Sequence, residues 1–145
     1  ADGELLTEGI KAGPYMIKPN LHELETAFGV KLESTDKIIL FCRELIKNYQ
    51  IRLILVSMGA KGALLITEEE CFYSSPVDVV VKSTVGAGDS MIAGMLFGIE
   101  QGLSLEEAFG YATACGTLAV TKEGTQSFSL EEVKQMYKKV IVTRI

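Results

Sequence analysis

The sequence predicts an α/β fold, because short runs of β-favouring residues alternate with longer segments of helical periodicity. Residues 52–57 contain the uninterrupted apolar run Leu53-Ile54-Leu55-Val56, which is typical of a strand buried on both faces in a parallel sheet. Apolar residues at helical spacing precede this strand over 34–49 and recur over 88–102. A chain of 145 residues, 48% of them hydrophobic, is long enough for a single domain, 1–145, with a true core.

Helix and strand signals divide the rest of the chain into short elements. Before Leu53 we expect a short helix ending near Gly13-Pro14, a strand at 15–17, and helices over 21–29 and 34–49, the latter capped by Ser34 or Thr35. After it we expect antiparallel strands at 62–67 and 71–74, a strand at 77–81, helices over 88–102, 104–121 and 129–140, and an edge strand over 140–145. Gly94 and Gly98 each cost their helix roughly 0.5–1 kcal/mol, so we expect that helix to pack closely against a neighbour.

Composition and charge exclude several classes of function. The net charge is −5 and the pI is near 5.0, without a basic run that could bind nucleic acid or an anionic membrane. The longest uncharged apolar run, 91–99, is far shorter than the ~20 residues of a membrane-spanning helix. Cys42, Cys71 and Cys115 are odd in number and widely spaced, which indicates neither a disulfide framework nor a zinc site and favours a reducing cytoplasm.

The segment Thr84-Val85-Gly86-Ala87-Gly88-Asp89-Ser90 joins a β-like run to an apolar helix. Its glycines let successive backbone N–H groups point to one spot, and the helix N-terminus adds positive charge, so the segment favours a phosphate. A carboxylate there repels the phosphate unless it accepts a proton from an attacking hydroxyl, which makes Asp89 a candidate general base. The alternative is that Asp89 only caps the helix, and on this motif alone capping is the preferred interpretation.

The segment Lys18-Pro19-Asn20-Leu21-His22-Glu23-Leu24 is a second candidate turn, at the end of the strand at 15–17. The preferred interpretation is structural, with Asn20 as helix N-cap and Glu23 reaching back to it. The functional alternative has Glu23 hold Mg²⁺ or its water shell, while Lys18 and Asn20 contact phosphate oxygens. His22 is expected to be a surface residue.

The segment Ser57-Met58-Gly59-Ala60-Lys61-Gly62 follows the buried strand and could border a nucleotide, although a plain turn is the preferred interpretation of this segment alone. The sequence lacks the GxxxxGK[ST], Rossmann, HExxH and GxSxG motifs, which disfavours P-loop enzymes, nicotinamide-dependent oxidoreductases, zinc proteases and α/β-hydrolases. All three candidate turns follow predicted strands, and open α/β sheets bind ligands at the carboxyl ends of their strands. Their conjunction therefore favours a phosphate-binding site.

In this order, Lys18-Pro19-Asn20-x-x-Glu23, Ser57 to Gly62 and Thr84 to Ser90 resemble the carboxyl-terminal half of the ribokinase-like (PfkB) carbohydrate kinases. The resemblance covers essentially the whole chain and implies a three-layer αβα fold, with helices on both faces of a mostly parallel central sheet. It implies ATP-dependent phosphoryl transfer, with Mg²⁺, to a hydroxyl of a sugar phosphate. The motifs are most similar to members that convert fructose 1-phosphate to fructose 1,6-bisphosphate, and next to members that act on tagatose 6-phosphate.

The resemblance also implies roles for individual residues. Asp89 would be the general base, with the backbone amides of Gly86, Ala87, Gly88 and Asp89 as the anion hole for the transferred phosphoryl group. Glu23 would organise Mg²⁺, with Lys18 and Asn20 near the triphosphate. Further nucleotide contacts would come from Ser57, Gly59, Ala60, Lys61 and Gly62, and around the adenine from Thr113, where some relatives have Asn, Gly116 and Thr117. Several members hold a monovalent cation, K⁺, at positions that match Ser83, Val85, Ala119, Lys122, Gly124 and Gln126.

Members of this family are about twice as long, and their amino-terminal half supplies most sugar contacts and the lid. We therefore expect the polypeptide to be a fragment that keeps the base and the nucleotide site, lacks the lid and has no activity alone. In that case it would act by itself as a nucleotide-binding module. The resemblance further implies a cytoplasmic protein whose full-length form is a homodimer.

Overall fold

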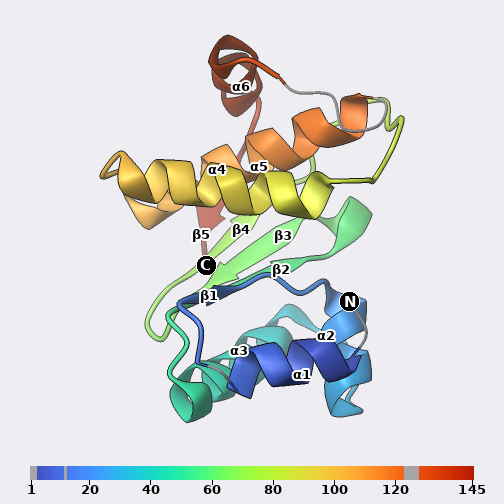
Figure 1. Cartoon of the computed structure of the whole chain (residues 1–145), viewed down its shortest axis with the longest axis vertical. Helices are drawn as coiled ribbons and strands as arrows, with labels where there is room; N and C mark the ends of the chain where they lie inside the picture. Colours follow the sequence, from blue (N-terminus) through green and yellow to red (C-terminus); the bar gives the residue numbers. More distant parts are fainter. Residues whose placement is uncertain (1–2, 12, 123–127) are drawn as a thin grey trace. The chain divides into compact units, whose positions relative to one another are not determined.

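The computed structural model describes residues 3–11, 13–122 and 128–145 (Figure 1). The chain divides into two compact units, one of residues 1–73 with 144–145 and one of residues 74–143. In chain order the elements are α1 (Gly3–Lys11), β1 (Met16–Ile17), α2 (Leu21–Phe28), α3 (Thr35–Tyr49), β2 (Leu53–Ser57), the 3-10 turn η1 (Gly59–Lys61), β3 (Ala63–Ile66), β4 (Cys71–Ser74), α4 (Ala87–Glu100), α5 (Leu105–Thr121), α6 (Leu130–Tyr137) and β5 (Val142–Arg144).

The strands form one mixed sheet in the order β1-β2-β3-β4-β5. β1 and β2 are parallel, because α2 and α3 return the chain between them, whereas β2 and β3 are antiparallel. The β2–β3 and β3–β4 connections are short, and a parallel crossover needs a dozen or more residues, so these strands must pair as hairpins. The α/β class is confirmed, but the expectation of a mostly parallel sheet is wrong for the described strands.

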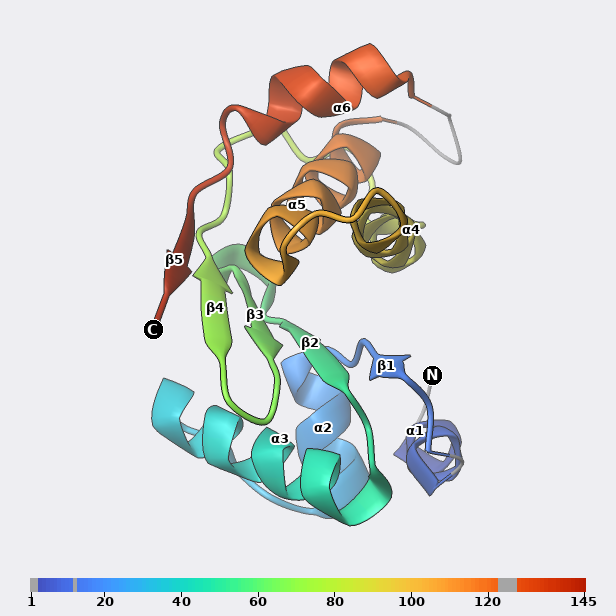
Figure 2. The ribbon, with the colours of Figure 1, turned by 90° about the vertical axis from the view of Figure 1, so that its left-hand side faces the viewer.

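The core of the first unit lies between α1–α3 and one face of the strands (Figure 2). Alternate strand residues Ile54, Val56, Leu64 and Ile66 are completely buried on this face. They pack against apolar residues of the three helices, namely Ile10, Leu24, Ile38, Cys42, Leu45 and Ile46. The intervening residues Leu53, Leu55 and Leu65 are buried as well. Residues on both faces of β2 are thus buried, as its uninterrupted apolar run predicts.

The helix starts follow from local capping. The side chains of Asn20, Ser34, Ser104 and Ser129 each accept a hydrogen bond from the backbone N–H three residues later. At all but Ser34 the glutamate at that later position reaches back to the cap, which completes a capping box. Ser34 rather than Thr35 caps α3.

In the second unit, α4 and α5 approach so closely that only glycine fits between them. A Cβ atom on Gly94 would lie 2.6 Å from the Tyr111 carbonyl oxygen, and one on Gly98 would lie 2.6 Å from the Cα of Ala108. The rings of Tyr111 and Tyr137 stack at 4.4 Å and join α5 to α6. The close packing expected from the two glycines is confirmed.

Residues 77–81 do not form the predicted strand. Val77 and Val79 pack against the α5–α6 core, whereas Val80 is 77% exposed. Just beyond, the N–H groups of Lys82 and Ser83 donate to the Val120 carbonyl at the end of α5, at 2.7 and 3.3 Å. The segment is therefore fixed by a helix end instead of a neighbouring strand.

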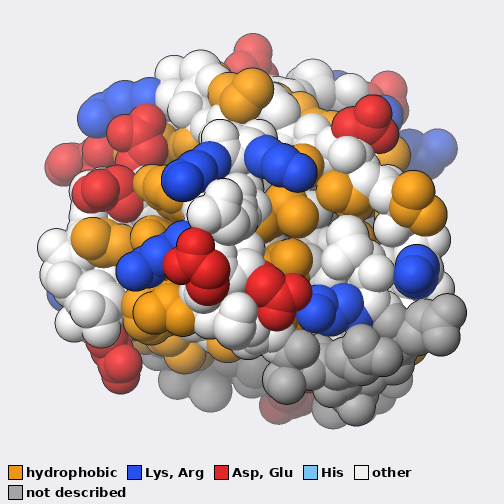
Figure 3. Space-filling view, turned by 90° about the horizontal axis from the view of Figure 1, so that it is seen from above, with side chains coloured by type: hydrophobic (Ala, Val, Ile, Leu, Met, Phe, Trp, Pro, Cys, Tyr) orange, Lys and Arg blue, Asp and Glu red, His pale blue; other side chains and the backbone are white. Residues whose placement is uncertain are grey.

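Acidic and basic side chains stand next to one another between apolar ones on the face shown in Figure 3, so neither sign of charge dominates there. None of the helices in the described part of the chain is long and apolar enough to cross a membrane. His22 is exposed, as expected.

Candidate active site

The turn before α4 presents backbone donors. Gly86 is the N-cap and adopts the left-handed region, with φ 81°, where a side chain would be strained. The Ser90 N–H donates to the Gly86 carbonyl (2.9 Å), which starts the helix. The N–H groups of Gly86, Gly88 and Asp89 have no hydrogen-bond acceptor among the described residues. Three donors at the positive end of a helix are thus available to an anion.

Asp89 occupies the third position of α4 and is exposed. Its carboxylate has no hydrogen-bond or ion-pair partner in residues 3–11, 13–122 and 128–145. The interpretation of Asp89 as the helix cap is therefore wrong, since Gly86 takes that position and no side chain caps the helix. An unpaired carboxylate beside amide donors can accept a proton from a group that attacks a bound anion.

The Asn20–Glu23 turn is a capping box. The Asn20 N–H donates to Glu23 Oε1 (2.9 Å), and the Glu23 N–H donates to Asn20 Oδ1 (2.7 Å). The structural interpretation of these residues is confirmed. The described residues contain no group of three or more His, Cys, Asp and Glu side chains that could hold a metal ion. A Mg²⁺ ion at Glu23 would accordingly keep water and phosphate ligands, which suits this ion, and that role stays a prediction.

The structure brings two of the three candidate turns together within the first unit. Asn20 and Ser57 form a parallel β-bridge, and the Ser57 N–H donates to the Pro19 carbonyl (3.1 Å). The two turns therefore follow neighbouring strands at the same edge, as the sequence predicts.

The turn after β2 is closed by its own backbone. The Met58 N–H donates to the Gly62 carbonyl (2.8 Å), and the Tyr73 hydroxyl donates to the Lys61 carbonyl (2.7 Å). Gly62 has φ 98°, where a residue with a side chain would be strained, while Ala60 and Lys61 are exposed. The segment is the plain turn that the sequence favours, and its contact with a nucleotide stays a prediction.

The residues expected around adenine have structural partners. The hydroxyl oxygens of Thr113 and Ser74 lie 2.8 Å apart in the interior. A Cβ atom on Gly116 would lie 2.5 Å from Met91 Cγ, so this glycine permits close helix packing. Thr117 is half-buried. Their contacts with adenine stay predictions.

Part of the predicted cation loop is ordered by backbone contacts. The Val85 N–H donates to Ser83 Oγ (3.1 Å), and the Lys122 N–H donates to the Ala119 carbonyl (3.4 Å). The Lys122 ammonium pairs with Glu132 at 2.9 Å. Gly124 and Gln126 lie outside the described residues.

Sequence reasoning missed the second partner of Glu132. The capping box with Ser129 is a local signal, whereas Lys122 lies ten residues away. The Ser129 N–H and then the Lys122 ammonium stabilise the charged form and hold the pKa of the Glu132 carboxyl below its ordinary value.

Comparison with known proteins gives a consistent result. Residues 3–133 match the family model described as pfkB family carbohydrate kinase. The chain is 41% identical to the 1-phosphofructokinase of Haemophilus influenzae over 97% of this chain and 45% of that protein, and 36% identical to the 1-phosphofructokinase of Bacillus subtilis over 99% and 46%. The crystal structure of Escherichia coli phosphofructokinase-2 with substrates and products superposes with a TM-score of 0.85 at 31% identity, over 94% of this chain and 45% of that one.

This chain therefore spans about half the length of the curated relatives that it matches. The similarity to solved sugar kinases confirms the ribokinase-like fold class. The motifs predict similarity to family members that act on fructose 1-phosphate, and both relatives bear the name 1-phosphofructokinase, which confirms that similarity.

Proposed function

Since the chain belongs to the pfkB family of carbohydrate kinases, we propose that it supplies the general base and nucleotide contacts for ATP-dependent phosphorylation of a sugar phosphate. The observation that carries this proposal is the unpaired, exposed Asp89 carboxylate beside the unsatisfied N–H groups of Gly86 and Gly88. The acceptor that the relatives' names favour is fructose 1-phosphate, with fructose 1,6-bisphosphate as the product.

In the proposed reaction, Asp89 accepts the proton of the sugar hydroxyl while the hydroxyl oxygen bonds to the γ-phosphorus of ATP. The bond from this phosphorus to the β–γ bridging oxygen breaks, and ADP leaves. The free N–H groups of Gly86, Gly88 and Asp89 stabilise the negative charge on the transferred group. The N–H of Ala87 donates to the Thr84 carbonyl at 3.4 Å and would have to leave this acceptor to join them. Mg²⁺ would neutralise charge on the β- and γ-phosphates, with Glu23 orienting its water shell.

The proposal assigns the triphosphate contacts to Lys18 and Asn20 and the border of the nucleotide to residues 57–62. The β-bridge between Asn20 and Ser57 supports these two assignments, since it joins the turns that carry them. Around adenine, the proposal keeps Gly116 and Thr117 and uses the backbone of Thr113, because the Thr113 hydroxyl already bonds Ser74.

The proposal extends to a K⁺ ion held through Ser83, Val85, Ala119, Lys122, Gly124 and Gln126. A solved structure of Escherichia coli phosphofructokinase-2 contains potassium, which supports a test of K⁺ here. We further propose a cytoplasmic protein whose complete form is a homodimer. Replacing K⁺ by choline in a thermal-unfolding series would check the ion, and sedimentation analysis would check the dimer.

Calorimetry with ATP and Mg²⁺ on this chain tests the nucleotide site. Phosphotransfer is then assayed on the chain alone and on the chain joined to the amino-terminal half of the Haemophilus influenzae relative. Fructose 1-phosphate, fructose 6-phosphate and tagatose 6-phosphate serve as acceptors. We expect ATP binding by the chain, transfer by the joined protein, and fructose 1-phosphate as the preferred acceptor.

The variant Asp89→Asn removes the base while it keeps the size of the side chain. We expect kcat of the joined protein to fall about 10²- to 10⁴-fold with ATP affinity nearly unchanged. Asp78→Asn, at an exposed position, is the matched control. A loss of less than tenfold in Asp89→Asn would show that the carboxylate is not the base, and full activity of the chain alone would show that it needs no second half.

A further inference from the structure

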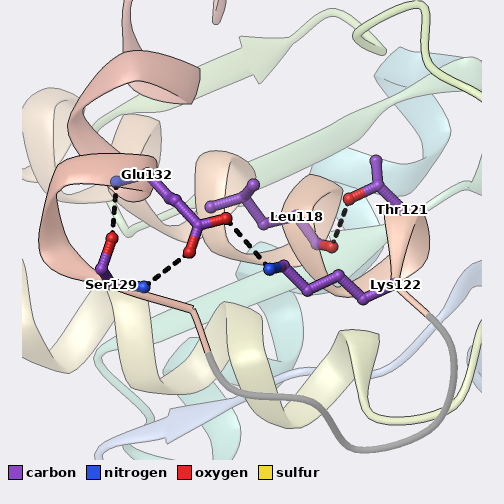
Figure 4. Close-up of polar contacts among 5 residues, drawn as sticks. All are labelled: Leu118, Thr121, Lys122, Ser129 and Glu132. Carbon is purple, nitrogen blue, oxygen red and sulfur yellow. Dashed lines mark hydrogen bonds and ion pairs between the residues drawn. The ribbon is translucent and has the colours of Figure 1, made fainter.

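One glutamate links the start of α6 to the end of α5 (Figure 4). Glu132 Oε1 accepts the N–H of Ser129, and its Oε2 accepts a hydrogen bond from Lys122 Nζ, both at 2.9 Å. The Ser129 hydroxyl in turn accepts the Glu132 N–H at 3.1 Å. Both carboxylate oxygens are therefore engaged, one by the helix cap and one by the residue that follows α5.

The end of α5 is held by several bonds around Lys122. The Thr121 hydroxyl donates to the Leu118 carbonyl (2.7 Å), and the Lys122 N–H donates to the Ala119 carbonyl (3.4 Å). The carbonyl of Val120, in the same last turn, accepts hydrogen bonds from the N–H groups of Lys82 and Ser83. The segment that leads toward α4 is thus hydrogen-bonded to the last turn of α5.

The same segment leads directly into residues 86–89, the turn at the start of α4 with N–H groups available to an anion, which we name the anion turn. Ser83 Oγ accepts the Val85 N–H at 3.1 Å, and Val85 immediately precedes Gly86, the N-cap of α4. Within the second unit, Glu132 is thus linked to Lys122 by an ion pair, and Lys122 to Val120 only along the peptide chain. Hydrogen bonds continue this path from Val120 to Ser83 and from Ser83 Oγ to Val85. It ends at the turn whose N–H groups are available to an anion.

We propose that Glu132 is a positioning residue, which holds the end of α5 through Lys122 and thereby fixes residues 82–85 and the anion turn after them. Capping of α6 requires one side-chain oxygen at position 132, and the amide oxygen of a glutamine can supply it. The second oxygen and the lysine are not needed for the cap. The expected effect of this placement on ATP binding rests on the proposed function, whereas the placement itself does not.

The position of the pair at the surface makes the two roles separable. An exposed ion pair adds little to stability, so its loss should leave the folded state populated. Glu132 is exposed and Lys122 is partly exposed, with side-chain exposures of 44% and 23%. If Glu132 positions residues 82–85, its loss should make this segment more mobile without a large change in the overall free energy of unfolding.

The test compares Glu132→Gln with Glu131→Gln, which removes a carboxylate from the same turn. Amide hydrogen exchange of this chain is followed by NMR at Lys82, Ser83 and Val85, whose N–H groups are bonded. We expect Glu132→Gln to speed exchange at these residues at least fivefold, with exchange in α1–α3 and the melting temperature nearly unchanged. Lys122→Met should match it, and Lys122→Arg should restore slow exchange.

Calorimetry with ATP and Mg²⁺ supplies the second readout, in which we expect Glu132→Gln to weaken binding about three- to tenfold. Unchanged exchange at residues 82–85, or faster exchange throughout the chain, would overturn the proposal. Faster local exchange with unaltered ATP affinity would overturn its functional part. If the unmodified chain binds no ATP, the proposed function fails, and the exchange data still decide whether Glu132 fixes this segment.

Discussion

The hydroxyl oxygens of Ser74 and Thr113 lie 2.8 Å apart, and the two residues are 1% and 8% exposed. They join the end of β4 to the middle of α5 across 39 positions of sequence. No buried side-chain nitrogen or oxygen in the described part of the chain lacks a hydrogen-bond partner. The two hydroxyls therefore satisfy each other's need for a hydrogen-bond partner in the interior.

Removing one hydroxyl of this pair should cost more than removing both. We expect Ser74→Ala to lower the free energy of unfolding by about 1–3 kcal/mol, because the Thr113 hydroxyl is left buried without a partner. The double variant Ser74→Ala/Thr113→Val should recover a large part of that loss. Urea unfolding of the single and double variants measures the coupling, and strictly additive losses would contradict an energetic link between the residues.

Local signals in the sequence predict the helix starts well. Ser104 and Ser129 act as caps because the glutamate three positions later is present in the same turn. Gly94 and Gly98 likewise reveal a close helix contact, since nothing else repays their cost within a helix.

Features set by distant residues are not visible in the sequence. Residues 77–81 read as a strand, yet the carbonyl of Val120 holds the chain just beyond them, and no local pattern signals this bond. The choice between capping and catalysis at Asp89 likewise depends on the backbone of Gly86, which takes the cap position. The ion pair of Glu132 with Lys122 falls in the same class, because its partners are ten residues apart.

Alanine at the helix contact should destabilise the second unit. In Gly94→Ala the new methyl group would lie 2.6 Å from the Tyr111 carbonyl oxygen and 2.9 Å from Cys115 Sγ. Overpacking of this kind costs about 1–3 kcal/mol, which exceeds the gain in helix propensity. Gly9→Ala in α1 is the matched control, since its Cβ would meet nothing within 4 Å. We expect thermal unfolding to show a lower melting temperature for Gly94→Ala and an equal or higher one for Gly9→Ala.

The cysteines should be unreactive while the chain is folded. Burial raises the pKa of the Cys42 thiol to about 12 and that of Cys71 to about 11, and burial also raises the pKa of Cys115. Because the thiolate is the nucleophile, we expect iodoacetamide at pH 8 to label all three only after unfolding in urea. Mass spectrometry of labelled protein checks this, and rapid labelling of Cys42 without denaturant would contradict its burial.

The same thiols predict a loss of stability at alkaline pH. Their pKa values are higher in the folded state than in the unfolded state, so the unfolded chain ionises first as the pH rises. Their contribution is complete below about pH 8.5, the ordinary thiol pKa, and decreases as the pH rises toward the folded values. We expect the urea midpoint to fall between pH 8 and pH 10. In Cys42→Ala the fall should be smaller, whatever the stability of that variant at pH 7.

Acid should remove the contribution of Glu132. Its pKa is lower in the folded state, through the Ser129 N–H and the Lys122 ammonium, so its charged form adds stability above the unfolded pKa of about 4.3. As the pH falls through the folded pKa, the carboxylate is protonated and this contribution is lost. We expect Glu132→Gln to lower the melting temperature only slightly at pH 6, and we expect this small difference from the unmodified chain to shrink toward zero near pH 3. Glu131→Gln controls for the loss of a negative charge, and a difference that grows toward acid would show that the ionised Glu132 opposes folding.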